Sequence, residues 1–84
     1  MAKSRVFVYE DPRGWRYYWR EGDAFAYMLR ANTSVDLLEE CLQLERAGTP
    51  PVGSVGCRWT PGLFDEDGVR LLVVCEKGRF HKLR

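Results

Sequence analysis

Apolar and polar residues alternate with a period of two over the first part of the chain, which is typical of strands. Residues 4–10 and 15–20 are rich in β-branched and aromatic side chains, and residues 11–14 (Asp-Pro-Arg-Gly) suit a type I turn closed by a left-handed glycine. The pattern predicts a hairpin. Its expected pairs are Val6 with Arg20, Phe7 with Trp19, Val8 with Tyr18, Tyr9 with Tyr17 and Glu10 with Arg16.

Strand alternation then divides the hairpin into two faces. One face carries Phe7, Tyr9, Trp15, Tyr17 and Trp19, and the other carries Val6, Val8, Glu10, Arg16, Tyr18 and Arg20. A domain of 84 residues has little core to spare, so large aromatic rings are expected to be buried in it. We therefore expect the five-aromatic face to pack under helices and the Arg/Tyr face to point outward.

The middle of the chain has the apolar spacing of two helices. Asp23 is expected to cap a short helix over residues 24–31, and residues 33–36 contain a plausible capping box for a second helix over residues 35–47. Gly48 suits the end of that helix because glycine readily adopts the left-handed conformation.

The last third of the chain predicts strands. Residues 52–60 alternate loosely, residues 69–76 are almost continuously apolar, and residues 79–84 suit a short final strand. A turn is expected at Asp67-Gly68. Together the elements predict one α+β domain over residues 1–84. It would have an antiparallel or mixed sheet of about five strands, in the order ββααβββ, with two short helices packed on one face.

Composition narrows the function classes. The formal net charge is +1, which argues against a strongly basic nucleic-acid binder and against an acidic DNA mimic. No apolar run is long enough for a transmembrane helix, and no signal peptide is present, so we expect a cytoplasmic protein that does not enter membranes. Arg far outnumbers Lys and Ile is absent, which indicates a GC-rich bacterial or phage genome.

The cysteines and the single histidine do not form a recognisable reactive site. Cys41, Cys57 and Cys75 are odd in number and widely spaced, so they indicate neither a disulfide framework nor a zinc site. His81 is expected opposite Val74, which places it on the other face from Cys75. We therefore expect no catalytic residue, no metal and no cofactor, and cysteines that act as small buried hydrophobic residues.

The remaining candidate surface is the outward hairpin face, with contact residues Arg13, Arg16, Tyr18 and Arg20. Arg and Tyr are enriched at the energetic centres of protein interfaces. We expect a small non-catalytic regulatory or adaptor protein that binds another protein, such as a phage or mobile-element inhibitor of a host protein, or that forms a homodimer through this face. The alternative is a nucleic-acid-binding module that uses the same residues, extended by Arg58, Arg79, Lys82 and Arg84.

Overall fold

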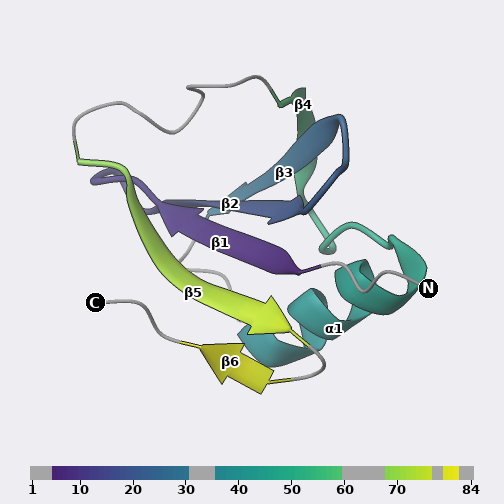
Figure 1. Cartoon of the computed structure of the whole chain (residues 1–84). Coiled ribbons are helices and arrows are strands. Elements are labelled where there is room, and N and C mark those ends of the chain that lie inside the picture. Colours follow the sequence, from purple (N-terminus) through teal and green to yellow (C-terminus); the bar gives the residue numbers. More distant parts are fainter. Residues whose placement is uncertain (1–4, 31–35, 60–67, 77–78, 82–84) are drawn as a thin grey trace.

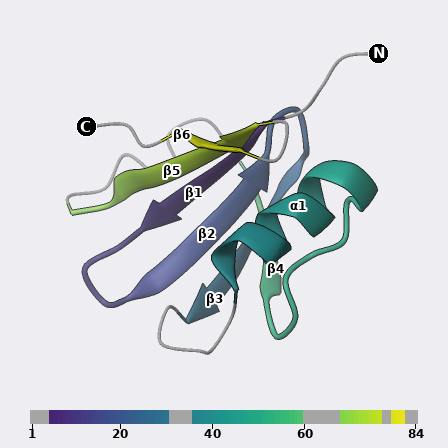
Figure 2. The same cartoon turned by 90° about the horizontal axis from the view of Figure 1, so that it is seen from below.

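Within the residues it describes, a computed structural model shows one six-stranded sheet with a single helix on one of its faces (Figures 1 and 2). The structure describes residues 5–30, 36–59, 68–76 and 79–81. The elements are β1 (Val6–Glu10), β2 (Trp15–Arg20), β3 (Phe25–Arg30), α1 (Leu37–Ala47), β4 (Val55–Arg58), β5 (Arg70–Glu76) and β6 (Arg79–His81). The strand order is β4-β3-β2-β1-β5-β6, and every neighbouring pair is antiparallel. The α+β class is confirmed, whereas the expected numbers of strands and helices differ from those observed.

The first hairpin has the predicted register at all five pairs of β1 and β2. The Asp11 amide donates to the Trp15 carbonyl at 3.0 Å, and Gly14 has a φ of 89°. A side chain at that φ would be strained, so the glycine allows the tight turn that sets the register.

The helix predicted over residues 24–31 is wrong, because Phe25–Arg30 form β3. Gly22, with a φ of 93°, turns the chain back directly after β2. Asp23 caps no helix, since its carboxylate accepts hydrogen bonds from the Arg20 guanidinium at 3.2–3.3 Å. A six-residue apolar segment is compatible with the periodicity of a helix and with that of a strand. Here it forms a strand because it pairs with β2 on one side and β4 on the other.

The second predicted helix is confirmed as α1, with a start two residues later than expected. Asp36 is the N-cap, and its carboxylate accepts a hydrogen bond from the Glu39 amide at 3.2 Å. Gly48 has a φ of 70°, and its amide donates to carbonyls of the last helical turn. The rest of the expected capping box and the turn expected at Asp67-Gly68 involve residues outside the described ranges.

The core lies between α1 and the sheet. Its members are Val6, Val8, Tyr18, Leu29, Cys41, Leu44, Val73 and Cys75. Tyr18 is the largest fully buried side chain, at 0% exposure. The assignment of hairpin faces from the sequence is therefore wrong: the face with Val6, Val8 and Tyr18 packs under α1, and the five-aromatic face lies on the other side of the sheet.

Candidate functional site

The sheet face opposite α1, which we call the open face, carries most of the large aromatic side chains. By strand register it includes Phe7, Tyr9, Trp15, Tyr17 and Trp19 from the first hairpin, Arg30 from β3, and Trp59 directly after β4. Arg30 is exposed and the aromatic side chains are partly exposed. No described helix covers this face, because α1 lies on the other side (Figure 1).

The aromatic rings of the open face are packed on one another and under arginines. Trp19 and Trp59 stack with ring centroids 4.6 Å apart and planes 8° from parallel, and Phe7 lies 5.5 Å from Trp19. The guanidinium carbon of Arg30 lies 5.2 Å from the Trp15 ring centroid, and that of Arg5 lies 5.1 Å from Phe7. These contacts shield ring surface and explain how the aromatics remain outside the main core.

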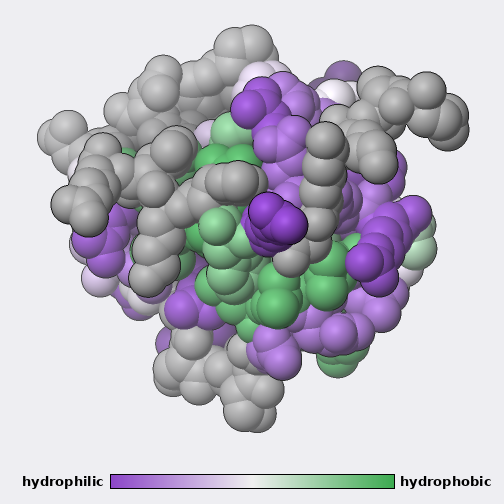
Figure 3. Space-filling model, turned by 60° about the horizontal axis from the view of Figure 1, so that its bottom comes forward, coloured by the Kyte–Doolittle hydropathy of each residue, from purple (hydrophilic) through white to green (hydrophobic). Residues whose placement is uncertain are grey.

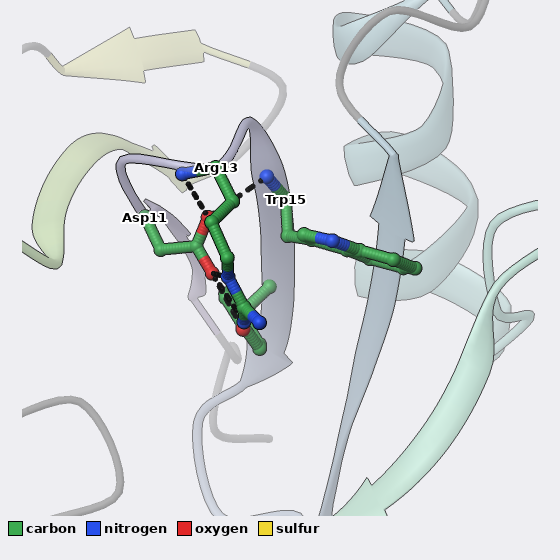
Figure 4. A network of polar contacts seen from close by, with 4 residues as sticks. Asp11, Arg13 and Trp15 are labelled. Atoms are coloured by element: carbon green, nitrogen blue, oxygen red, sulfur yellow. Dashed lines mark hydrogen bonds and ion pairs between the residues drawn. The ribbon is translucent and has the colours of Figure 1, made fainter.

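The turn at one end of the open face is held by the Asp11 carboxylate (Figure 4). Asp11 Oδ1 accepts hydrogen bonds from the amides of Arg13 and Trp15, both at 3.0 Å. Asp11 Oδ2 accepts from Arg13 Nη2 at 2.9 Å and from the Tyr17 hydroxyl at 3.0 Å. Burial acts to raise the pKa of Asp11, but these hydrogen bonds outweigh it and lower the pKa to about 2. The ionised carboxylate therefore fixes the positions of three neighbouring open-face and turn residues.

Of the four contact residues predicted from the sequence, only Arg13 is well exposed. Its side chain is 73% exposed and forms an ion pair with Asp11. That Arg13 contacts a partner stays a prediction. The expected exposed cluster of Arg16, Tyr18 and Arg20 is wrong, because these residues lie on the face that α1 covers.

The covered residues have roles inside the protein. The Arg16 Nε atom is buried and lies 3.9 Å from a Glu10 carboxylate oxygen. Arg20 pairs with Asp23 and donates to the Leu44 carbonyl of α1 at 3.3 Å. Burial raises the pKa of Tyr18, and the nearby Arg16 guanidinium opposes that rise. The Tyr18 hydroxyl is buried without a hydrogen-bond partner among the described residues.

The predicted faces are wrong because aromatic content alone does not decide which face a helix covers. A face that carries arginines can also pack under a helix. A helix can lie over Val6, Val8 and Tyr18 while the arginines of the same face extend to its margins, where their charged ends reach carboxylates and carbonyls. The apolar run of β5 indicates which face of the hairpin is buried. Val73 and Cys75 pair with Val8 and Val6, and Val8 pairs with Tyr18, so β5, β1 and β2 present a continuous apolar surface to α1.

The strand order separates the cysteine and histidine that could have formed a catalytic pair. β4, which carries Cys57, and β6, which carries His81, are at opposite ends of the sheet. The expected register of β6 is confirmed, with His81 opposite Val74 and Cys75 opposite Phe80. Within the described ranges, no three side chains among His, Cys, Asp and Glu come together as metal ligands.

A second surface lies on the side of α1 and β6. Figure 3 shows a central hydrophobic area there, bordered by hydrophilic side chains. Leu38 on α1 and Phe80 on β6 are each more than a third exposed. The first turn of α1 adds Glu39 and Glu40, so this side combines apolar and acidic residues, and its described residues make none of the aromatic–arginine contacts found on the open face.

Comparisons with protein-family models, with curated proteins and with solved structures gave no match to this chain. Among the described residues, no helix has both the length and the apolar character needed to cross a membrane. The geometry of the two sheet faces is therefore the remaining guide to function.

Proposed function

We propose that this chain is a small non-catalytic regulatory or adaptor protein that binds another protein through its open face. The observation that carries the proposal is the collection of partly exposed Trp, Tyr and Phe side chains, with arginines over two of the rings, on the face that α1 leaves uncovered. Trp, Tyr and Arg dominate the binding energy of protein interfaces because they bury large areas and keep a polar group for orientation.

The surface is also held in place before binding. The Asp11 carboxylate fixes the turn, and the Trp19 indole N–H donates to the Asp23 carbonyl at 2.9 Å. Side chains that are ordered in the free protein lose less conformational entropy when a partner binds. This favours a rigid contact surface over one that forms on binding.

The ring contacts favour a protein partner over single-stranded nucleic acid. Base stacking needs accessible ring faces. On the open face, Trp59 occupies one face of Trp19, and guanidinium groups lie over Trp15 and Phe7. These contacts reduce the ring-face area open to base stacking, which favours a protein partner with apolar side chains.

Affinity capture with two charge-reversal variants tests the proposal. Arg30→Glu changes the open face, and Arg46→Glu makes the same change at another exposed arginine, on α1. We expect wild type and Arg46→Glu to retain the same proteins from an extract of the source cells, and Arg30→Glu to lose them. Equal retention by both variants would show that the open face is not the binding surface.

Nucleic acid is tested in the same experiment. Nuclease treatment of the extract should leave the captured proteins unchanged, and their retention should fall only modestly with salt. Retention that disappears with nuclease, or that falls steeply and linearly on a log–log salt plot, would instead indicate binding through phosphates.

A further inference from the structure

Among the described residues, β4 is the last strand on its side of the sheet, and no other described strand pairs with its outer edge. The Trp59 amide donates to the Ala24 carbonyl at 2.8 Å, and hydrogen-bonded pairs alternate along an antiparallel ladder. Cys57 and Val55 therefore direct their backbone groups toward β3, and Gly56 and Arg58 direct theirs away from the sheet. Both outward residues are exposed.

Exposed apolar side chains lie on both sheet faces near this edge, Val55 on the open face and Phe25 on the other. Val55 on β4 is 58% exposed, Val52 in the turn before β4 is 81% exposed, and Phe25 on the neighbouring strand is 48% exposed. Proteins usually protect edge strands with lysine, proline or an inward-pointing charge, because an unprotected edge pairs with other chains. Residues Val55–Arg58 contain neither lysine nor proline, and their one charged side chain is Arg58 at the end of the strand.

We propose that β4 pairs antiparallel with β4 of a second copy of this chain, about a twofold axis at Cys57. In this register Gly56 pairs with the partner's Arg58 through outward backbone groups, and the symmetry repeats the pair. Cys57 then lies opposite the partner's Cys57, and Val55 lies opposite the partner's Trp59. The inference goes beyond the proposed function, since it concerns self-association at the β4 edge.

The register is self-complementary, which favours a second copy over an unrelated strand. The exposed Val55 side chain gains the Trp59 ring of the other copy as a cross-strand neighbour on the open face. Each Arg58 lies opposite a glycine, so the two guanidinium groups are not directly opposed. The formal net charge of +1 per chain gives little repulsion between copies. The two open faces would join into one surface.

Sedimentation equilibrium over about 10 μM to 1 mM tests the dimer, because a contact this short is expected to be weak. We expect twice the monomer mass at the upper concentrations. Gly56→Pro removes an outward N–H that β3 does not use, and proline is tolerated at such edge positions. It should raise the dissociation constant about tenfold or more, whereas Gly56→Ala should leave it close to wild type.

Val55→Lys provides a second variant that does not alter the backbone, and it should weaken the dimer to a similar extent. Leu38→Lys, which places the same charge on an exposed apolar position of α1, is its control and should leave the dimer intact. If circular dichroism shows that Gly56→Pro does not fold, Val55→Lys decides. A monomer at all concentrations, or a dimer that resists the β4 variants, would overturn the proposal.

Disulfide cross-linking through Cys57 tests the position of the twofold axis. Diamide, which accepts the two thiol hydrogens, should oxidise the two Cys57 side chains of a dimer to one intermolecular disulfide. Cys57→Ser should abolish the covalent dimer on non-reducing gels, because Cys41 and Cys75 are buried within each copy. A non-covalent dimer that does not cross-link through Cys57 would contradict the register.

Discussion

Replacement of Tyr18 by Ala tests which hairpin face belongs to the core. Tyr18 is fully buried between Val8, its partner on β1, and the apolar side of α1. Truncation of a buried aromatic side chain typically costs about 3–5 kcal/mol, a large share of the stability of so small a domain. Trp15→Ala, on the partly exposed open face, should cost clearly less, since it loses about 0.5–1 kcal/mol of cation–π contact and only part of a buried side chain.

Urea unfolding followed by circular dichroism measures both changes, provided that the dependence on urea concentration has the same slope in each variant. Two milder substitutions serve as controls. Tyr17→Phe removes a hydroxyl that donates to ionised Asp11 and should cost about 1.5–3 kcal/mol. Tyr18→Phe removes a buried hydroxyl without a described partner and should cost little. A larger loss for Trp15→Ala than for Tyr18→Ala would show that the faces are assigned the wrong way round.

Three further predictions concern charge, thiols and the helix end. The lowered pKa of Asp11 should contribute roughly 2 kcal/mol of stability, which is present above pH 4 and is lost as the pH falls through about 2. In Asp11→Asn, the free energy of unfolding should therefore fall less steeply at acid pH than in the wild type. An unchanged acid dependence would contradict the Asp11 hydrogen bonds. In native protein, Ellman's reagent should modify Cys57 first, and Cys41 and Cys75 only on unfolding; equal rates would contradict their burial. Gly48→Ala should cost about 1 kcal/mol in urea melts, because the residue has positive φ and a new Cβ would lie 3.3 Å from a guanidinium nitrogen; a neutral effect would contradict the helix cap.

The features that the sequence predicted correctly are those set by local chemistry. The Asp-Pro-Arg-Gly turn defines a hairpin register through its geometry alone, and the structure has that register. Gly48 ends α1 because glycine readily adopts the left-handed conformation, which is also a local property. These residues act on their immediate neighbours, so no knowledge of the remaining fold was needed.

The features that the sequence did not predict depend on contacts between distant segments. Residues 25–30 form a strand because β2 and β4 pair with them, and the Gly22 turn was the local signal that was overlooked. The choice of face depends on α1, whose position no hairpin residue reveals. The open face is a candidate because α1 lies on the other side of the sheet, and Trp59 joins it by stacking on Trp19, forty positions away in sequence.

The most direct test of the central claim is an NMR titration of labelled protein with a partner captured by the wild type. The account predicts that the indole N–H signals of Trp15 and Trp19 change on binding, while the amide signals of Glu39 and Gln43 on the outer side of α1 remain where they are. Changes concentrated on α1, with the indole signals unmoved, would contradict binding through the open face.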